Sequence, residues 1–534
     1  MNRWPLLGAV LLLMISSAYS QNAEPCAALA KVALPHAAIT RARMIEAGQF
    51  TPPGDPPNPG SAHTFQHTPA FCRVEIRSTP TPDSDIKIEV WLPAERWNGK
   101  FRGEGNGGFA GSIYYTSMAA SVSQGYASAG TDAGHTSGED TGASWALNHP
   151  EKIVDFGYRA IHEMTVAAKV IVSSYYSKAP ARSYFAACSD GGREALMEAQ
   201  RFPNDYDGIL AGAPAYVWTN LLTAGMSKTR ALTKDAASYL PAAKLPAISD
   251  AVLAACDASD GVKDGILNDP RTCGFKPEAL ACKGPETDSC LTPSQLATLK
   301  TIYAPTVSST GQQIYPGGLP GGELGGGGWG LWILGSEQGK SLGVAFGVNY
   351  FANMVYSDPH WDPTTFNVDN ALSAAIRTTA RALNATDPDL KAFASHGGKL
   401  ILYHGWNDPA ISALSTIDYY GQVIAANGDA KSFTRLFMVP GMQHCYGGPG
   451  PSNFGQFGWS GLGPDDAQHN IYRALEDWVD HGIAPEQVIA AKIEADGKTA
   501  PKITMTRPLC AYPKKAKYNG NGDTSDAANF TCSE

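Results

Sequence analysis

A serine at a sharp turn is the strongest candidate for chemistry in this chain. Ser189 stands between an aromatic, Ala-rich run that ends at Cys188 and a run of good helix formers from Glu194 to Arg201. A strand, a sharp turn and a helix expose a nucleophilic serine beside the backbone N–H groups that begin the helix. The pattern for such a turn is G-x-S-x-G, and Ala187 replaces its first glycine here. The alternative is a structural serine buried in the turn.

An acid and a base follow two later strand-like runs. Residues 399–403 lead to Asp408, and residues 433–439 lead to His444. A serine hydroxyl is a weak nucleophile until a histidine removes its proton, and a carboxylate orients that histidine. Ser189, Asp408 and His444 occur in the chain order that α/β-hydrolases use. We therefore expect an α/β-hydrolase core with these three catalytic residues, although either of the last two taken alone is more typical of an ordinary loop residue.

A glycine-rich loop at residues 103–111 follows an early strand-like run. Its glycines match G-x-G-x-x-G, which is typical of dinucleotide binding. No clear helix pattern follows at residues 112–117, and an exported protein meets little NAD, so we reject that interpretation. Bare backbone in this position is suited to supplying one N–H of an oxyanion hole. A flexible surface loop is the alternative.

The first 20 residues have the features of an export signal. Arg3 precedes an apolar stretch from Leu6 to Ile15, and the small-x-small sequence that ends at Ser20 predicts cleavage there. An apolar core of about ten residues is too short to span a bilayer comfortably. We therefore expect a secreted or periplasmic protein with no membrane partner.

Charge and cysteine content narrow the function classes further. The net charge is −9, and no cluster of Lys and Arg occurs, which argues against a nucleic-acid partner. All ten cysteines lie beyond the export signal, and none forms a C-x-x-C pair. In an exported chain this even number indicates five disulfides, whose connectivity the composition leaves open.

Beyond Ala215 the alternation of strands and helices stops. Residues 216–395 are rich in Ala, Gly and Pro, and we interpret them as a lid domain inserted into a catalytic domain formed by residues 21–215 and 396–534. Several lid aromatics are candidates for lining a cleft that binds an aromatic ring, with packing between lid and core as the alternative. The candidate substrate-binding residues are Trp329, Trp332 and Phe351.

A loop inside the lid carries oxygen donors. Three aspartates are spaced around two glycines in residues 256–266. Calcium takes about six to eight oxygen ligands from carboxylates and main-chain carbonyls, and glycine permits the tight curvature that this requires. An acidic turn with aspartate caps is the alternative, and no organic cofactor is expected. The expected calcium ligands are the side chains of Asp257, Asp260 and Asp264 and the carbonyls of Val262 and Ile266.

These residues resemble the tannase and feruloyl esterase family of α/β-hydrolases, which includes bacterial mono(2-hydroxyethyl) terephthalate hydrolases. The resemblance rests on two specific motifs, Cys188-Ser189 and His444-Cys445, and it covers nearly the whole mature chain. It implies that Ser189 is the nucleophile, that His444 is the general base and then the acid, and that Asp408 orients His444. It also implies that the calcium loop is a site in the lid.

The resemblance further implies the oxyanion hole and the disulfides. The N–H of Asp190 would act with that of Gly108, or of Gly107 in its place. A bond between the cysteines beside nucleophile and base would hold these two residues together, and an error of about 1 Å at a catalytic site can cost about a hundredfold in rate. The implied pairs are Cys26–Cys72, Cys188–Cys445, Cys256–Cys273, Cys282–Cys290 and Cys510–Cys532.

One departure from the family narrows the expected substrate. Its terephthalate monoester hydrolases hold a free carboxylate with a lid arginine, and a planar guanidinium suits that group. No arginine occurs between Arg271 and Arg377, and Lys340 is the only Lys or Arg from Ala304 to Ile376. We therefore expect weak discrimination for a free carboxylate.

The sequence thus predicts a secreted serine carboxylesterase that hydrolyses esters of aromatic, phenolic acids, such as feruloyl or galloyl esters, through an acyl-enzyme. The expected partner is a small aromatic ester, and the sequence leaves the oligomeric state open. One alternative is an esterase of the mono(2-hydroxyethyl) terephthalate hydrolase type. Another, from a different class, is a non-catalytic, calcium-stabilised binding protein on a hydrolase scaffold.

Overall fold

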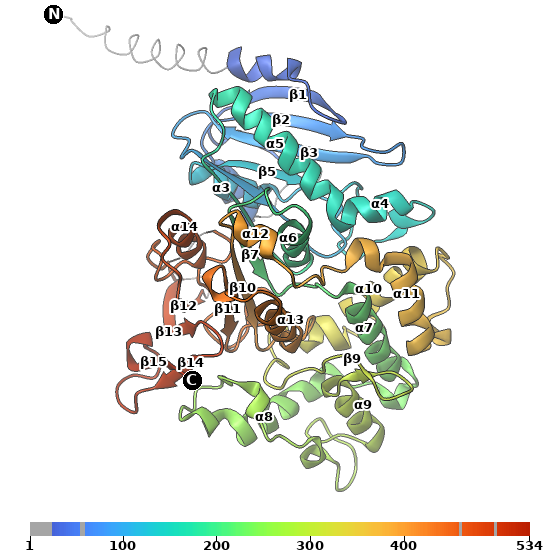
Figure 1. Ribbon diagram of the computed structural model, residues 1–534. Helices are drawn as coiled ribbons and strands as arrows, with labels where there is room; N and C mark the ends of the chain where they lie inside the picture. Colours follow the sequence, from blue (N-terminus) through green and yellow to red (C-terminus); the bar gives the residue numbers. More distant parts are fainter. Residues whose placement is uncertain (1–23, 54–58, 459–461, 496–498) are drawn as a thin grey trace, which may run out of the picture.

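The computed structural model describes residues 24–53, 59–458, 462–495 and 499–534. The export signal predicted for residues 1–20 lies outside these ranges. A nine-stranded sheet forms the centre of the molecule, in the order β1-β2-β3-β5-β4-β6-β7-β10-β11 (Figure 1). Its strands are β1 (Ala37–Ile45), β2 (Phe71–Ser78), β3 (Ile86–Pro93), β4 (Lys100–Glu104), β5 (Ala127–Thr131), β6 (Arg182–Cys188), β7 (Gly208–Gly212), β10 (Lys399–Gly405) and β11 (Thr434–Val439).

Most of this sheet is parallel. The pairs β1–β2, β2–β3 and β3–β5 are antiparallel, whereas β5, β4, β6, β7, β10 and β11 pair in parallel. The carboxyl ends of the parallel strands meet at one edge, where α/β proteins place their ligands. The chain is therefore a mixed α/β protein with a large, predominantly parallel sheet, which is the class that the sequence predicts.

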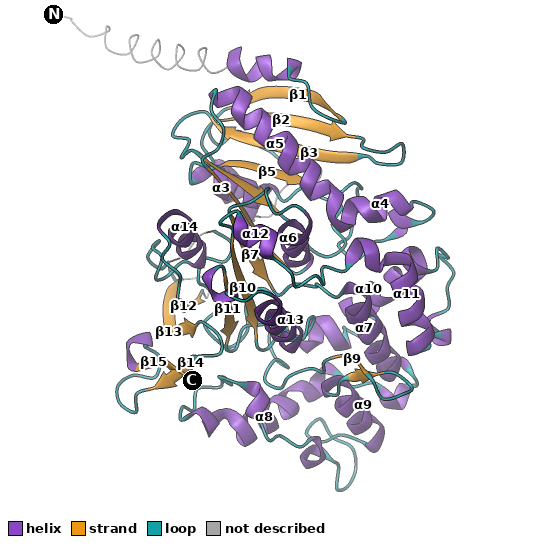
Figure 2. Ribbon diagram, in the orientation of Figure 1, coloured by secondary structure: helices purple, strands orange, loops and turns teal. Residues whose placement is uncertain are grey.

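Helices cover both faces of the sheet (Figure 2). Successive strand residues point to opposite faces, so Tyr184 and Phe185 of β6 lie in different apolar clusters. One face packs against α5 (Ala160–Tyr176), α6 (Asp190–Arg201) and α13 (Ala413–Ala426), and the other packs against α3 (Tyr115–Ser123) and α14 (Ile471–His481). Burial on both faces is the usual environment of parallel strands.

The segment between β7 and β10 is mainly helical and adds no strand to the large sheet. Its elements are α7 (Trp218–Thr233), α8 (Leu245–Cys256), α9 (Pro293–Tyr303), β8 (Thr306–Val307), β9 (Gln313–Tyr315), α10 (Leu342–Asn349), α11 (Val368–Leu383) and α12 (Lys391–Ser395). In Figure 1 most of its labelled elements lie in the lower part of the molecule, towards the right, whereas α12 lies near the centre beside α6 and β7. The remaining elements are α2 (Pro59–Gln66), α4 (Pro150–Val154), β12 (Gln487–Glu494), β13 (Lys502–Cys510), β14 (Lys515–Tyr518) and β15 (Phe530–Ser533).

Five disulfides join the ten cysteines in the pairs that the family resemblance implies. The bond between Cys188 and Cys445 closes the longest loop, with a sequence separation of 257 residues. The other pairs are Cys26–Cys72, Cys256–Cys273, Cys282–Cys290 and Cys510–Cys532.

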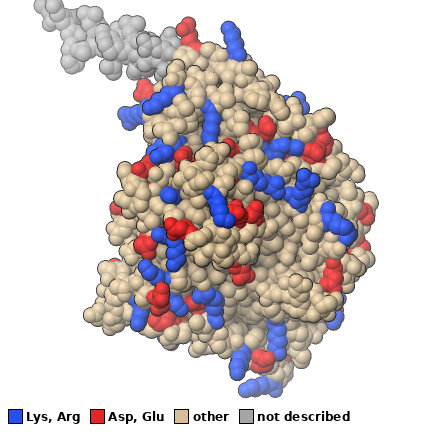
Figure 3. Space-filling view, viewed as in Figure 1, with Lys and Arg blue, Asp and Glu red and all other residues tan. Residues whose placement is uncertain are grey.

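Charges of both signs share the surface. On the face that Figure 3 shows, Lys and Arg side chains are interspersed with Asp and Glu side chains. In the part of the chain that the structure describes, none of the helices combines the length and the apolar character that crossing a membrane requires.

Helix α6 approaches β7 so closely that its first turn needs a glycine. A Cβ on Gly192 would lie 2.2 Å from the carbonyl oxygen of Gly212 in β7. The strand has little freedom to retreat, because it is paired with β6 on one side and β10 on the other. This close approach brings the start of α6 to the edge of the sheet where the parallel strands end.

Replacement of Gly192 by alanine is therefore expected to lower the free energy of unfolding by roughly 1–3 kcal/mol, because overpacking displaces backbone. Gly421→Ala in α13 is the matched control, since no atom lies within 4 Å of the added Cβ. This control is expected to gain roughly 0.5–1 kcal/mol, the usual preference of a helix for Ala over Gly. Urea unfolding measures both values, and a neutral Gly192→Ala variant would contradict the proposed packing.

Candidate active site

Ser189 occupies the turn between β6 and α6. Its backbone angles, φ 69° and ψ −121°, lie in a region that residues other than glycine rarely adopt, and such strain clusters at functional sites. Both main-chain groups of the residue are held. The Ser189 N–H donates to the carbonyl of Gly212 (3.0 Å), and the N–H of Ala215 donates to the Ser189 carbonyl (3.1 Å). The turn is therefore fixed by the end of β7.

The alanine that departs from the G-x-S-x-G pattern fits because two other positions are glycine. The methyl group of Ala187 lies 2.6 Å from where a Cβ on Gly105 would stand, and 2.4 Å from where a Cβ on Gly191 would stand. Either additional methyl group would overlap it. The methyl group of Ala187 therefore occupies space that Gly105 in the neighbouring loop and Gly191 in α6 leave free.

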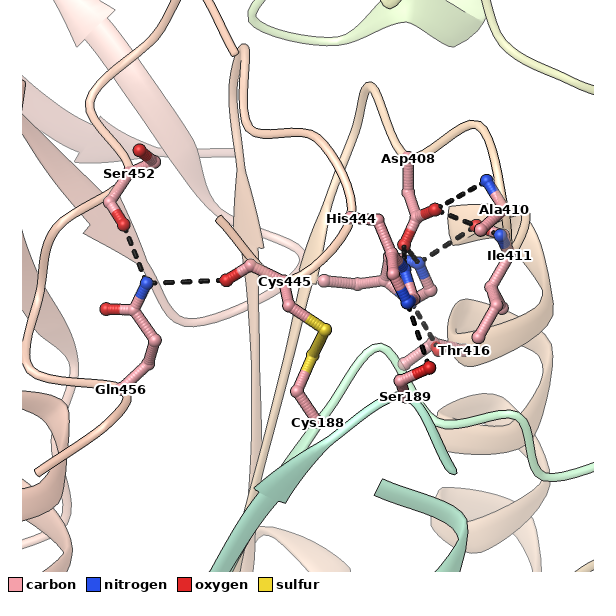
Figure 4. Close-up of a disulfide and its surroundings, with 11 residues drawn as sticks. Cys188, Ser189, Asp408, Ala410, Ile411, Thr416, His444, Cys445, Ser452 and Gln456 are labelled. Carbon is pink, nitrogen blue, oxygen red and sulfur yellow. Dashed lines mark hydrogen bonds and ion pairs between the residues drawn. A yellow bond between two sulfur atoms is a disulfide. The ribbon is translucent and has the colours of Figure 1, made fainter. Parts of the chain in front are cut away.

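The three predicted catalytic side chains form one hydrogen-bonded chain (Figure 4). His444 Nε2 lies 2.9 Å from Ser189 Oγ, and His444 Nδ1 lies 2.7 Å from Asp408 Oδ2. Asp408 follows β10 and His444 follows β11, so the parallel sheet brings both to the edge where β6 presents the serine. This is the arrangement in which a carboxylate orients a histidine and the histidine removes a proton from the serine.

Asp408 is held in its charged form. Its side chain is buried, and Oδ1 accepts hydrogen bonds from the N–H groups of Ala410 (2.8 Å) and Ile411 (2.9 Å). Burial alone would raise the pKa of Asp408. The charge of His444 and the hydrogen bonds from His404 and His444 outweigh burial and hold this pKa well below its usual value.

A second histidine touches the carboxylate, and the sequence analysis assigned it no role. His404 Nε2 faces two acceptors, Asp408 Oδ2 at 3.2 Å and the carbonyl of Ile411 at 3.1 Å. Nε2 therefore carries the hydrogen, and Nδ1 accepts from the hydroxyl of Thr416 at 2.7 Å. His404 is completely buried. Its position in β10, four residues before Asp408, is a signal that could have identified it.

The disulfide between Cys188 and Cys445 lies beside the serine and the histidine (Figure 4). The two cysteines directly precede Ser189 and directly follow His444. The carbonyl of Cys445 also accepts a hydrogen bond from Gln456 Nε2 at 3.4 Å. The turn after β6 and the loop after β11 are thus joined covalently next to the atoms that must stay in contact.

The glycine-rich loop lies against the start of α6. Gly108 has a φ of +60°, and a Cβ there would stand 2.5 Å from the carbonyl oxygen of Asp140, so this position requires glycine. The loop is held by Glu194 in α6, whose Oε2 accepts from the N–H of Asn106 at 2.8 Å. Gly108 and Asp190 both line the cavity that contains Ser189. The Tyr114 hydroxyl lies beside Gly107, 2.8 Å from where a Cβ on that residue would stand.

A cavity of about 820 Å³ opens onto the serine. Its walls come from the glycine-rich loop, the turns after β6, β10 and β11, and the segment between β7 and β10. The Trp332 ring meets the His444 ring edge-on at a centroid distance of 4.8 Å and stacks with Phe346 at 6.0 Å. Trp329 also lines the cavity, although it is largely buried against Tyr303. Trp332, which is half-buried, is therefore placed to contact a bound aromatic ring, whereas Trp329 contributes mainly to packing.

Phe351, the third candidate for substrate binding, corrects the sequence analysis. Its ring is completely buried and does not line the cavity. It packs against Tyr350, Trp361 and Phe366, with centroid distances of 5.0 to 5.6 Å. An aromatic ring that is surrounded by other apolar side chains contributes to core packing, which was the alternative explanation for these residues.

The glycine run at residues 317–330 packs on the loops that carry the acid and the base. A Cβ on Gly322 would lie 2.4 Å from the carbonyl oxygen of Asn407, the residue before Asp408. Gln443, which precedes His444, donates from Nε2 to the carbonyl of Leu324 at 2.5 Å. The small residues therefore permit backbone to lie directly on backbone beside the catalytic groups.

The predicted calcium loop is closed by its own hydrogen bonds. Asp257 Oδ1 accepts from the N–H of Gly265 at 3.0 Å, and Asp260 Oδ1 accepts from that of Val262 at 3.0 Å. Asp264 Oδ2 pairs with Arg507 at 2.6 Å. The three carboxylates do not all lie within 4.8 Å of one another. Burial raises the pKa of Asp260, and the charge of Asp264 adds to the rise. Every potential donor in the loop is an oxygen atom, the type of ligand that calcium takes.

The sequence is similar to that of known esterases. A profile of the family described as "Tannase and feruloyl esterase" matches residues 72–533. An uncharacterised esterase of Xanthomonas campestris pv. campestris is 41% identical in an alignment that covers 95% of this chain and 91% of that protein. A probable feruloyl esterase B-1 of Aspergillus fumigatus is 35% identical, covering 89% of this chain and 88% of that protein.

Solved structures agree with these similarities. The crystal structure of feruloyl esterase B from Aspergillus oryzae superposes with a TM-score of 0.85 at 30% identity, covering 96% of this chain and 99% of that one. The tannin acyl hydrolase of Aspergillus niger shares the fold, with a TM-score of 0.71 at 21% identity over 96% of this chain and 95% of that one. The chain therefore belongs to the tannase and feruloyl esterase family, and it is an esterase of the feruloyl esterase and tannase type.

Proposed function

We propose that the protein is a secreted serine carboxylesterase that hydrolyses esters of aromatic, phenolic acids, such as feruloyl or galloyl esters, through an acyl-enzyme. The contact of 2.9 Å between His444 Nε2 and Ser189 Oγ carries this proposal. A base at hydrogen-bonding distance, held in turn by Asp408, is what makes a serine hydroxyl nucleophilic.

The reaction begins when Ser189 Oγ attacks the ester carbonyl carbon and His444 takes the hydroxyl proton. The negative charge that develops on the carbonyl oxygen faces the N–H groups of Asp190 and Gly108, which form the oxyanion hole. Asp190 begins α6, so the helix dipole adds to this stabilisation. His444 then gives the proton to the departing alcohol, and the acyl group stays on Ser189.

Water completes the cycle in the second half of the reaction. His444 removes a proton from the water, the resulting hydroxide attacks the acyl-enzyme, and Ser189 leaves with the proton that His444 returns. Asp408 stays ionised throughout and stabilises the imidazolium. His404 acts as a positioning residue, because its hydrogen bond to Asp408 helps to fix the carboxylate that fixes His444.

An aromatic acid is the acyl group that the cavity favours. Trp332 lies against His444, and its stacked partner Phe346 also meets Phe109 beside the glycine-rich loop. Flat rings of this kind bind another ring through its face or its edge. The names of the related feruloyl esterases support the same substrate class.

We also propose that residues 216–395 form a lid over a catalytic domain made of residues 21–215 and 396–534. The packing of the glycine run on the acid and base loops, and the contribution of α7 to the cavity wall, support this division. The five disulfides support export to the periplasm or the medium, where such bonds persist.

A calcium ion is proposed to stabilise the loop in the lid. Asp257, Asp260 and Asp264 would hold it with their carboxylates, and Val262 and Ile266 with their carbonyls. Its contribution would be structural, since it would neutralise carboxylates that repel one another. Asp264 would share its charge between the ion and Arg507.

The first test is the Ser189→Ala variant, which is expected to lose about 10⁴-fold or more in kcat/KM because no other group replaces the nucleophile. Methyl ferulate, methyl gallate and a short-chain p-nitrophenyl ester are suitable substrates. Ser395→Ala, which removes an exposed hydroxyl from α12, is the matched control. Wild-type rates in Ser189→Ala, or a failure of the wild type to react with a fluorophosphonate, would refute the serine mechanism.

The second test concerns His404. His404→Leu removes the hydrogen bond to a charged carboxylate, an interaction worth about 1.5–3 kcal/mol, so kcat is expected to fall roughly 10- to 100-fold. His404→Gln keeps an N–H donor and is expected to recover part of the loss. Thermal unfolding of both variants serves as the control. If both lose equal activity in proportion to their loss of stability, His404 has only a structural role.

The third test is calcium removal. Chelation is expected to lower the free energy of unfolding, and calcium at about 100 times its Kd is expected to restore about 2.7 kcal/mol by mass action. Asp260→Asn is expected to weaken this response, and magnesium is the control ion. Unfolding curves that are identical with calcium and after exhaustive chelation would argue against the site.

A further inference from the structure

One face of α7 forms part of the cavity wall, and this face carries a lysine. The residues of this helix that line the cavity are Trp218, Leu221, Leu222, Ala224, Gly225, Lys228, Thr229 and Leu232. Most of them recur at intervals of three and four, which places them on one side of a helix. Except for Thr229, the neighbours of Lys228 on this face are apolar. Such a surface suits an aromatic substrate, but it offers an ammonium group nothing to bind.

Lys228 differs from the paired charges of the cavity because it has no partner. Arg102 pairs with Glu104 at 3.2 Å, and Asp190 pairs with Arg193 at 2.6 Å. Within the described ranges the ammonium of Lys228 has neither a hydrogen bond nor an ion pair. Burial lowers its pKa to about 8, and no neighbouring carboxylate counteracts the shift. The group therefore stays mostly protonated at neutral pH, in surroundings that penalise an uncompensated charge.

The position of Lys228 fits the far end of an elongated substrate. Helix α7 begins three residues after Ala215, whose N–H donates to the carbonyl of Ser189. Lys228 lies ten residues beyond Trp218, which corresponds to about 15 Å along the helix axis. Side chains on a helix point toward its N-terminus, so the ammonium extends back toward the end of α7 that adjoins Ser189. The lysine is thus placed beyond the reacting ester along the same wall.

We propose that Lys228 binds a carboxylate carried by the substrate at the end remote from the scissile ester. The inference rests on the proposed esterase function and names a substrate class for the same site. A carboxylate accepts charge-assisted hydrogen bonds from an ammonium, which are stronger than those a neutral ester can accept. The charged group could belong to the acyl part or to the alcohol part of the substrate, because α7 runs along the cavity as a whole.

This proposal reverses the expectation of weak discrimination for a free carboxylate. That expectation considered only the cations between Arg271 and Arg377, whereas α7 lies earlier in the chain. Lys340, the only Lys or Arg from Ala304 to Ile376, is exposed and does not line the cavity. The acid at the cavity rim, Asp140, is exposed and forms no ion pair with Lys228, so the ammonium stays available to a ligand.

Two matched substrate pairs test the proposal. Monomethyl and dimethyl terephthalate differ by a charge on the acyl part, and 4-carboxyphenyl acetate and its methyl ester differ by a charge on the alcohol part. The wild type is expected to prefer the charged member of one pair. In Lys228→Met, which keeps the chain length but removes the charge, the ratio of kcat/KM for charged over neutral substrate should fall roughly 10- to 100-fold, mainly through KM. Lys228→Arg should retain most of the preference for the charged substrate. Lys340→Met, which removes a cation outside the cavity, is the control and should leave the ratio unchanged.

The pair that responds identifies the part of the substrate that carries the carboxylate. An unchanged ratio in Lys228→Met for both pairs, with the enzyme active on each, overturns the proposal and leaves the esterase function intact. Calorimetric binding of monomethyl terephthalate and of 4-carboxyphenyl acetate to Ser189→Ala, with and without Lys228→Met, gives a readout that needs no turnover. If the double variant, Ser189→Ala with Lys228→Met, binds each of these carboxylates as tightly as the Ser189→Ala variant does, Lys228 does not recognise the carboxylate. Failure of the wild type on every ester would instead refute the proposed function.

Discussion

The hydrogen bond between His444 and Ser189 is the contact on which the rest of the structure depends. It joins residues 255 positions apart in the chain, so no local preference of the chain can form it. The parallel sheet brings β6, β10 and β11 to a common edge, and the disulfide between Cys188 and Cys445 ties the two loops together. Closing so long a loop would cost the unfolded chain a few kcal/mol of conformational entropy. The geometric effect at the reacting atoms matters more, because catalysis tolerates little displacement.

Close backbone contact is the second constraint at this site. Gly191 and Gly105 leave room for the methyl group of Ala187, and Gly192 lets α6 lie against β7. The glycine run between β9 and α10 makes the same kind of contact with the loops of Asp408 and His444. Glycine at these positions therefore reflects packing rather than flexibility. This explains how a segment of low complexity comes to lie directly beside the catalytic residues.

The catalytic residues and the residues proposed to bind the substrate come from different parts of the chain. The serine, the histidine and the acid stand on the ends of sheet strands, where they are rigidly held. The groups proposed to contact the substrate, among them Trp332 and Lys228, come from the segment between β7 and β10. A change at Lys228 is therefore expected to alter the substrate preference while the hydrogen bonds among Ser189, His444 and Asp408 stay in place.

The sequence by itself determined the class of fold, the order of the three reactive residues and, with the family resemblance, the cysteine pairs. These depend on local signals such as a strand, a small-residue turn and a cysteine next to the serine, all readable along the chain. Only the tertiary structure decided that Phe351 is in the core, that His404 touches Asp408 and that Lys228 faces the cavity. Each of these depends on which side of a strand or helix faces a distant part of the chain. The periodicity of the sequence defines the sides of a helix or strand, but only the packing of the folded chain decides which residues lie opposite each side.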